Sequence, residues 1–471
     1  MSQVLALAAI SAATGAASST FITKYRDDPA SFVLDCINWR GDDGPSEYQL
    51  DVLRKIPKER RVSVRGPHGL GKTALAAWVI LWFALTRDGE DWKIPTTASA
   101  WRQLTKFLWP EIRKWARRLK WKEIGREPFN ERLELMSLNL KLETGEAFAL
   151  ASDNSAMIEG AHASQLLYVF DEAKIIPPDT WDSAEGAFST GDAYWVAIST
   201  PGEPLGRFYD IHSRKPGYDD WWVRHVTLAE AIKAGRINQS WADQRKLQWG
   251  EKSAAYQNRV VGEFATSEED GVISLALVEQ ANERWYEWVE NGKPGEFTCV
   301  GVDVGRGGDK SVYAKRYEWA IDELMRSNER DVMPVAGRTK GIIDNYGGYS
   351  VVDVIGIGAG VVDRLREQDM DVVPFNASER TDKRDHSGEL GFTNKRSAAW
   401  WNMREILGSE PVALPPDDKL IGDLIAPKWR VMSGGKIQVE SKDSIKERLG
   451  RSPDDGDAVI MAFYDDRTWW I

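Results

Sequence analysis

The chain has few residues of the kinds that form disulfides, zinc sites or membrane spans. Only two of its 471 residues are cysteines, Cys36 and Cys299, and they lie far apart in the sequence. This pattern excludes a disulfide framework and the closely spaced ligands of a zinc site, and it is typical of a reducing cytoplasm. No apolar run approaches the roughly 20 residues that a membrane-spanning helix needs. We therefore expect no membrane partner.

Positive charge is not in excess either. The formal net charge is −11, so the whole molecule is no polycation, and any nucleic-acid binding must depend on local basic surfaces or on metal ions. The segment at 4–17 is rich in Ala, Leu and Ser, but no basic residue precedes Lys24. It therefore lacks the charged start of a signal peptide, and we expect a short helix or a disordered lead. The length predicts two or three domains.

The clearest motif is a phosphate loop that follows a short alternating strand at 61–65. Gly66 is followed by four residues and then by Gly71, Lys72 and Thr73, which is phosphate-loop spacing. Backbone N–H groups of such a loop converge on phosphate oxygens, and the next helix adds the positive end of its dipole. Lys72 would reach the β- and γ-phosphates, and Thr73 would ligate Mg²⁺. The predicted nucleotide-binding loop comprises Gly66, Pro67, His68, Gly69, Leu70, Gly71, Lys72 and Thr73. The alternative is a glycine turn between a strand and an ordinary amphipathic helix.

Two later strands end in polar residues that suit the same nucleotide site. An apolar run ends in Asp171 and Glu172, as expected for a buried parallel strand whose carboxyl end reaches a site. Asp171 would hold Mg²⁺, and Glu172 would orient and deprotonate the attacking water. A second apolar strand ends in Ser199 and Thr200, a position that senses the γ-phosphate in motor ATPases. By itself, that segment is only a turn.

Two further segments of this half allow two interpretations each. Gln49 precedes the phosphate loop and could read the adenine edge with its amide, or it could be an ordinary residue of a helix surface. A helix predicted from Trp101 to about Trp121 is rich in Lys, Arg and Trp. We favour an amphipathic helix with a tryptophan-lined core face over a DNA contact, because basic helical faces are common.

Acidic residues in the second half stand on two apolar strands and at the start of a helix. The strands carry Asp303 and Asp353, and the segment with Asp454 and Asp457 places both on one face if it is helical. Buried carboxylates are costly unless they are paired with cations. Two divalent metal ions about 4 Å apart, which activate water and stabilise the leaving oxygen of a phosphodiester, would account for all four. For any single one of them, an unrelated strand-end carboxylate is the alternative.

In their order along the chain, these motifs resemble the large terminase subunit of tailed bacteriophages over nearly the full length. The resemblance is carried by residues 66–73, 170–173, 199–200, 301–305, Asp353 with the glycines after it, and 452–458. It implies an α/β protein with an N-terminal RecA-like P-loop ATPase domain and a C-terminal ribonuclease-H-like nuclease domain. With the turn-rich breaks at 266–271 and 291–295, the expected division is a lead segment at 1–44, an ATPase domain at 45–265, a linker at 266–295 and a nuclease domain at 296–471.

The resemblance also implies an activity and its cofactors. ATP hydrolysis with Mg²⁺ would move double-stranded DNA into a procapsid, and a separate site with two Mg²⁺ or Mn²⁺ would cut concatemeric DNA. The expected catalytic residues are Lys72, Glu172, Asp303, Asp353 and Asp457, with Ser199 and Thr200 in coupling. The expected metal ligands are Thr73 and Asp171 at the first site, and Asp303, Asp353, Asp454 and Asp457 at the second.

The implied partners are the portal protein of the procapsid, a small terminase subunit and further copies of the chain in a ring on the portal. The implied place of action is the host cytoplasm, not the mature virion. The resemblance supports Gln49 as an adenine contact, and it suggests Lys395, Arg396 or Lys442 as contacts of the nuclease domain with DNA.

One departure from the family pattern concerns the arginine that many members carry four residues before the loop lysine. Here that position is His68, which is not reliably charged at neutral pH. The transition-state arginine would then be Arg65, Arg102 or one from a neighbouring subunit. Two rival interpretations remain: a DNA-repair helicase-nuclease, which usually needs a second RecA-like domain, and a non-enzymatic assembly protein with a relic nucleotide fold, against which the intact Lys72, Thr73, Asp171 and Glu172 argue.

Overall fold

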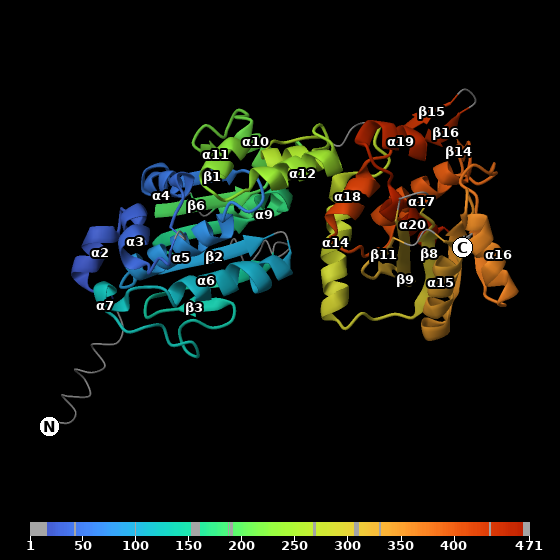
Figure 1. The fold of residues 1–471 in the computed structure, drawn as a ribbon. Helices are drawn as coiled ribbons and strands as arrows, with labels where there is room; N and C mark the ends of the chain where they lie inside the picture. Colours follow the sequence, from blue (N-terminus) through green and yellow to red (C-terminus); the bar gives the residue numbers. More distant parts are fainter. Residues whose placement is uncertain are drawn as a thin grey trace. The chain divides into compact units, whose positions relative to one another are not determined.

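The computed structural model describes residues 17–41, 44–98, 100–151, 161–186, 188, 192–266, 270–305, 310–328, 331–432 and 435–464. The lead expected at 4–17 lies, except for its last residue, outside them. The chain divides into two compact units, shown in Figure 1. The first unit comprises residues 1–242 and 257–265, and the second unit comprises 243–256 and 266–471. No helix among the described residues is long and apolar enough to cross a membrane.

The first unit is built on a seven-stranded sheet with the order β3-β4-β2-β5-β6-β1-β7. Its strands are β1 (Arg61–Arg65), β2 (Trp92–Ala98), β3 (Asn139–Lys141), β4 (Gly145–Ala151), β5 (Gln165–Asp171), β6 (Asp192–Ser199) and β7 (Trp222–His225). All neighbouring strands are parallel except β3 and β4. Because β6 lies between β1 and β5, the strand that ends in Ser199 separates the phosphate-loop strand from the strand that ends in Asp171. The first unit therefore has the RecA-like arrangement that was predicted.

Apolar side chains alternate across this sheet and bury both of its faces. On β5, Leu167 and Val169 belong to one core cluster, and Tyr168 and Phe170 belong to another. Such double burial explains why the strand is a continuous apolar run. The helices of this unit are α2 (Ser19–Tyr25), α3 (Pro29–Cys36), α4 (Glu47–Glu59), α5 (Lys72–Arg87), α6 (Trp109–Ala116), α7 (Trp121–Ile124), α9 (Pro178–Gly186), α10 (Gly206–His212) and α11 (Leu228–Lys233). The helix predicted to follow the phosphate loop is α5, and it is buried almost all round.

The helix expected from Trp101 to Trp121 is shorter than predicted and contains a π-helical turn. That turn is η1 (Gln103–Leu108), and α6 ends at Ala116. Pro110 has no N–H for the usual bond to residue 106, and the Trp109 N–H bonds instead to the carbonyl of Leu104, as a wider turn requires. Trp109 and Trp115 are buried in the core, as the amphipathic interpretation predicted.

The second unit contains a mixed six-stranded sheet and a small three-stranded sheet. The large sheet has the order β10-β9-β8-β12-β13, with β11 paired to β9. Its strands are β8 (Phe297–Asp303), β9 (Ser311–Tyr317), β10 (Ala320–Ile321), β11 (Met325–Ser327), β12 (Tyr349–Asp353) and β13 (Val372–Phe375). The small sheet is formed by β14 (Gly391–Phe392), β15 (Trp429–Val431) and β16 (Lys436–Val439). β8 is antiparallel to β9 and parallel to β12, as in the predicted ribonuclease-H-like class.

Helices cover the large sheet, and the helix that begins with the acidic residues Asp454 and Asp457 packs on β8. They are α14 (Leu275–Glu290), α15 (Val332–Tyr346), α16 (Gly358–Glu367), α17 (Lys395–Ser409), α18 (Asp418–Ile425), α19 (Lys442–Leu449) and α20 (Asp454–Phe463). α20 begins at Asp454, as the helical interpretation of that segment predicted, and it packs on β8 and β9.

The stretch expected to be a linker at 266–295 is largely helical. α14 buries Leu275, Val278, Ala281, Trp285 and Trp288, an apolar spacing of three and four residues that the turn-rich breaks on either side obscured. The helix packs against α17 and α18. In addition, residues 243–256, expected in the first domain, group with the second unit. This segment includes the end of α12 (Gln239–Trp249) and α13 (Ala254–Tyr256), and η4 (Gln257–Val261) follows it.

Candidate functional site

The phosphate loop between β1 and α5 has a backbone that only glycine tolerates at several positions. Gly69 and Gly71 have φ of 80° and 79°, in the left-handed region that other residues rarely adopt. At Gly66, an added Cβ would lie 2.7 Å from the Leu70 side chain and 2.9 Å from the Val226 carbonyl oxygen. The glycines of the sequence motif therefore stand at the positions where this turn requires glycine.

Lys72 lies inside the loop and is buried. Its ammonium donates hydrogen bonds to the carbonyl oxygens of Pro67 at 2.7 Å and Gly66 at 3.3 Å. Burial lowers the pKa of Lys72 to about 8, against a smaller opposing effect of Glu172 and Asp171. A buried cation whose hydrogen bonds go to carbonyl dipoles is poorly compensated, so an anionic ligand at the loop would relieve the cost of burying it.

Asp171 and Glu172 lie at the end of β5, close to that lysine. Burial, and then the neighbouring Glu172, raise the pKa of Asp171 to about 7. Glu172 has a left-handed backbone with φ of 47°, and its side chain meets the end of β6. There its Oε2 lies 3.1 Å from Ser199 Oγ and 3.4 Å from Thr200 Oγ1. The structure thus brings the two predicted coupling residues into contact with the predicted general base.

The oxygen donors at this site suit a hard divalent cation. The Asp171 carboxylate is buried, and Thr73 is half-buried in the first turn of α5. Carboxylate and hydroxyl oxygens are ligands that Mg²⁺ accepts. Loop N–H groups and the α5 N-terminus suit phosphate oxygens. Both donor sets come from the residues that the sequence singled out.

Gln49 lies against the phosphate loop, but both ends of its amide have protein partners. Its Oε1 accepts hydrogen bonds from the Ser46 backbone N–H at 2.9 Å and the Ser46 hydroxyl at 3.0 Å. Its Nε2 donates to the carbonyl oxygen of Gly71 at 3.0 Å. In this structure Gln49 therefore caps α4 and supports the loop; its contact with adenine stays a prediction.

The two candidate arginines of this unit, Arg65 and Arg102, both have local contacts. Arg65 forms hydrogen bonds to Glu263 at 2.6 Å and to the Gly262 carbonyl oxygen at 2.7 Å. The guanidinium of Arg102 lies 5.2 Å from the ring centre of Phe107. The His68 backbone N–H bonds to the Arg259 carbonyl oxygen at 2.9 Å. The segment 257–263 therefore braces the loop, a role that its sequence did not indicate.

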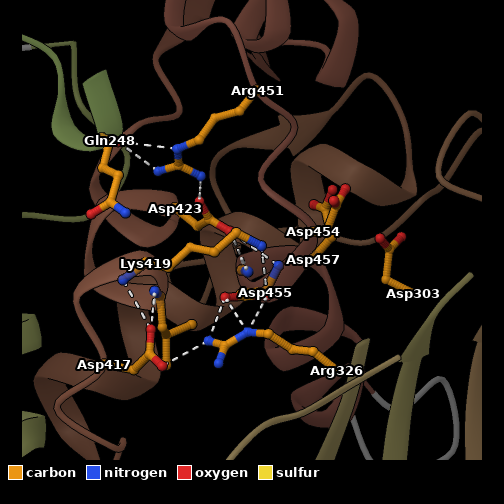
Figure 2. A network of polar contacts seen from close by, with 12 residues as sticks. Gln248, Asp303, Arg326, Asp417, Lys419, Asp423, Arg451, Asp454, Asp455 and Asp457 are labelled. Carbon is orange, nitrogen blue, oxygen red and sulfur yellow. Dashed lines mark hydrogen bonds and ion pairs between the residues drawn. The ribbon is translucent and has the colours of Figure 1, made fainter. Parts of the chain in front are cut away.

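In the second unit, four carboxylates gather at the ends of two strands and the start of one helix. The register that pairs Val352 with Val302 places Asp353 beside Asp303 on parallel strands. Asp454 and Asp457 lie in the first turn of α20. Figure 2 shows the side chains of Asp454 and Asp457 on the side of the helix that faces Asp303.

Gly301 allows α20 to approach β8 this closely. An added Cβ at Gly301 would lie 2.1 Å from the Ala458 carbonyl oxygen and 2.7 Å from the Ala462 backbone nitrogen. Glycine on the strand and alanines on the helix therefore let the strand that carries Asp303 and the helix that carries Asp457 pack closely. This contact explains why Gly301 precedes Asp303 on the strand and why Ala458 follows Asp457 on the helix.

The ammonium of Lys442 lies among these carboxylates. Its Nζ lies 3.0 and 3.1 Å from the two oxygens of Asp303, 3.0 Å from Asp454 and 3.5 Å from Asp457. Burial alone would lower the pKa of Lys442, but Asp303, Asp457 and Asp454 together raise it well above its ordinary value. Within the described part of the chain, no three Asp, Glu, His or Cys side chains form a ready metal cage. Three of the carboxylates, those of Asp303, Asp454 and Asp457, instead lie around the Lys442 ammonium.

Burial and the Lys442 ammonium shift the pKa values of these carboxyl groups in opposite directions. Burial raises the pKa of Asp303 well above its ordinary value, and Lys442 opposes this. Burial also raises the pKa of Asp353. For Asp454, burial is outweighed by Lys442 and Ser452, which hold its pKa below its ordinary value. Oxygen donors that gather on one cation suit a divalent metal ion better than one ammonium, because a metal ion can take six or more of them.

Two of the expected DNA contacts have other partners. Arg396 is buried and donates to Asp457 Oδ1 at 2.6 Å, and the Trp400 indole N–H lies 3.2 Å from the same oxygen. Arg396 is therefore placed to hold Asp457 and not to meet a DNA backbone. Lys395 pairs with Glu379 at 2.9 Å. The pairing of Lys395 with Glu379 could not be predicted from the position of Lys395 at the start of a helix.

Comparison with known proteins gives related sequences. No protein-family model matches the chain. It is 25% identical over 300 residues to a probable large terminase subunit of Enterobacteria phage P7, which covers 61% of this chain and 57% of that relative. It is 24% identical over 323 residues to the large terminase subunit of Thermus phage G20c, covering 63% of this chain and 62% of that protein. The match thus spans about three fifths of each of these curated relatives.

Solved structures give the following similarities. The large terminase of a thermophilic bacteriophage aligns with 89% of this chain and 99% of its own, at 13% identity and a TM-score of 0.42. The nuclease domain of the large terminase subunit of bacterial virus Sf6 aligns with 41% of this chain and 98% of its own, at 19% identity and a TM-score of 0.36. At the level of sequence, the chain is similar to the large terminase subunits of phages, which confirms the resemblance that its ordered motifs predicted.

Proposed function

We propose that the chain is a viral DNA-packaging protein that hydrolyses ATP in its first unit and cuts DNA in its second. The observation that carries the nuclease half is the convergence of Asp303, Asp454 and Asp457 on the ammonium of Lys442. The observation that carries the ATPase half is the phosphate loop after β1, with Asp171 and Glu172 at the end of β5, one strand removed in the same parallel sheet.

In the ATPase half, each residue has a task that its position supports. The loop N–H groups and Lys72 would bind the triphosphate, and Thr73 and Asp171 would hold Mg²⁺, which supplies charge neutralisation at the phosphates. Glu172 would take a proton from the attacking water. Ser199 lies between the Glu172 carboxylate and the Thr200 carbonyl oxygen, 2.6 Å away, so a change in its hydrogen bonding would connect the state of the nucleotide with β6.

In the nuclease half, Asp303, Asp353, Asp454 and Asp457 would hold two Mg²⁺ or Mn²⁺, which together supply the activation of water and the stabilisation of the leaving oxygen. Because the Lys442 ammonium lies among the same oxygens, it would have to give way to the metal. Its displaced positive charge would then be available to a DNA phosphate. Arg396 would hold the Asp457 carboxylate in place through their hydrogen bond.

The proposed biological setting is the host cytoplasm. The partners would be double-stranded DNA, a portal protein, a small terminase subunit that selects the first cut, and further copies of the chain in a ring. The proposed domain roles are packaging ATPase for the first unit and nuclease for the second. A helicase-nuclease is less well supported, because the second unit has a mixed sheet with an acidic cluster in place of a second RecA-like sheet.

The ATPase half is tested with Glu172→Gln in the purified full chain. The variant should bind a fluorescent ATP analogue like the wild type and should lose hydrolysis by about 100-fold or more, because the general base is removed. Undiminished hydrolysis would favour a different base or a relic fold.

The nuclease half is tested with Asp303→Ala in a plasmid-nicking assay with Mn²⁺. We expect cleavage to fall to background while ATP hydrolysis persists. A variant that still nicks plasmid DNA would contradict the assignment of this cluster.

A further inference from the structure

A second set of acidic residues lies behind the carboxylates proposed to bind metal. Asp455 follows Asp454 in the sequence, but it is fully buried and its side chain lies on the other side of α20, away from Asp303 (Figure 2). Asp423, on α18, is also fully buried. Neither residue reaches the proposed metal position, so the nuclease mechanism does not use them directly.

Asp423 caps the helix that carries Asp454 and Asp457. Its Oδ2 accepts hydrogen bonds from the backbone N–H of Asp455 at 3.0 Å and of Gly456 at 3.4 Å. The first N–H groups of a helix have no partner within the helix, and Pro453 at the cap position of α20 provides no side-chain acceptor. The cap is therefore supplied by a residue more than thirty positions earlier in the chain, from a different helix.

Cations fix both buried carboxylates. Arg326 donates to Asp455 at 2.7 Å and to Asp417 at 2.7 Å, and Lys419 lies 3.0 Å from Asp455. Asp423 pairs with Arg451. Buried carboxylates are costly without such partners, and losing one partner of a buried pair costs more than the pair contributes.

The network also connects α20 with a distant part of the chain. Arg451, besides pairing with Asp423, donates to the Gln248 carbonyl oxygen at 2.7 and 3.1 Å. Gln248 lies on α12, in the segment 243–256 that belongs to this unit. The indole N–H of Trp249, the next residue, donates to the Asp418 carbonyl oxygen at 2.7 Å. The first turn of α20 is thus held directly from β11 and α18, and α12 holds Arg451 and Asp418 behind them.

We propose that Asp423 and Asp455, with Arg326, Lys419 and Arg451, are positioning residues of the nuclease site. They fix the first turn of α20 so that Asp454 and Asp457 present their carboxylates to the metal ions. This inference rests on the proposed nuclease function. Residues that orient metal ligands typically change metal affinity by about 10- to 100-fold when they are removed, although they never touch the metal.

The test is Mn²⁺ binding to the full-length protein without nucleotide, measured by titration calorimetry. Asp303→Ala defines the signal that belongs to the nuclease site. We expect Asp423→Ala to weaken that signal at least about tenfold. Asp423→Asn should bind more tightly than Asp423→Ala, because its amide oxygen still accepts both N–H bonds. As a control, Asp344→Ala removes an exposed ion pair with Lys340 on α15 and should bind Mn²⁺ like the wild type.

A readout of cleavage separates positioning from general damage. If Asp423 acts through metal affinity, the cleavage rate of Asp423→Ala should recover toward that of the wild type as Mn²⁺ is raised to saturation. Should Asp423→Ala fail to fold, Lys419→Met keeps the cap and removes one partner of Asp455, and several-fold weaker Mn²⁺ binding is expected.

The outcomes separate a failure of the proposed nuclease from a failure of the positioning role. If the wild type has no Mn²⁺ signal that Asp303→Ala removes, the proposed nuclease and this inference both fail. If that signal exists and the folded Asp423 or Lys419 variants bind Mn²⁺ with wild-type affinity, the nuclease stands and the positioning role is overturned.

Discussion

Lys72 and Asp171 have opposite charges but share one cause for their unusual ionisation, which is burial at the phosphate loop. The pKa of Lys72 is lowered to about 8 and that of Asp171 is raised to about 7. Mg²⁺ needs the ionised carboxylate, and the triphosphate needs the charged ammonium. We therefore expect the free protein to bind MgATP best between these two pKa values.

This ionisation predicts a bell-shaped pH profile of kcat/KM for MgATP, which reports the groups of the free enzyme. Activity should rise as pH increases through about 7, because Asp171 loses its proton, and should fall above about 8, because Lys72 loses its charge. Steady-state ATPase rates at several MgATP concentrations, with activity after return to neutral pH as the control, provide the check. A profile that is flat across this range would show that these two groups do not limit the reaction.

Ser199 is one of two residues whose hydroxyls contact the Glu172 carboxylate. Its hydroxyl lies between the Glu172 carboxylate and the Thr200 carbonyl oxygen, so Ser199→Ala removes one of the two hydroxyls that orient Glu172. We expect kcat to fall by about tenfold while KM for ATP changes little, since general-base catalysis as a whole contributes about 10²- to 10⁴-fold. Ser240→Ala, at an exposed serine, is the matched control. A change in KM with an unchanged kcat would place Ser199 in binding instead.

At the scale of elements, the contact between β8 and α20 decides whether the carboxylates can meet. Gly301→Ala would force the helix away from the strand, because the new Cβ would overlap the Ala458 carbonyl oxygen. We expect a loss of stability of about 1 to 3 kcal/mol, seen as a lower thermal unfolding midpoint, together with weaker Mn²⁺ binding.

Gly341→Ala, on α15, is the matched control for that substitution. An added Cβ there meets no atom within 4 Å, so alanine should be neutral or should stabilise the helix by up to about 1 kcal/mol. If both alanine variants behaved alike, close packing at Gly301 would not be what holds the acidic helix in place.

The elements that were predictable from the sequence are those whose geometry is encoded locally. The glycines at 66, 69 and 71 specify the loop after β1, and apolar runs that end in Asp171, Asp303 or Asp353 specify buried strands with acids at their ends. Parallel neighbours bring such ends together, which is why the convergence of Asp303 and Asp353 was foreseeable.

Contacts between distant segments were not predictable. Pro110 signals an irregular helix but not which wider turn will form. Nothing near Asp423 shows that it caps a helix starting at Asp454, because the cap depends on how α18 packs on α20. The burial of Arg396 against Asp457 and the insertion of Lys442 among the acids likewise follow from packing, since neither residue differs locally from a surface cation.

At the scale of the whole molecule, a net charge of −11 constrains how DNA would be bound. Contacts should be local and mainly to phosphates, so affinity for duplex DNA should not depend on sequence and should fall about tenfold or more between about 50 and 200 mM salt. Fluorescence anisotropy with two unrelated duplexes tests this. Salt-insensitive or sequence-selective binding by the chain alone would argue against a packaging motor that depends on a partner to select its site.

The most direct test of the two-site account is a crystal structure of the full chain soaked with Mn²⁺ and analysed by anomalous scattering. If the acidic cluster binds metal, Mn²⁺ density should lie between Asp303, Asp353 and Asp457, with the Lys442 ammonium withdrawn from those oxygens. Density only at other positions, with Lys442 still joining Asp303 to Asp454, would contradict it.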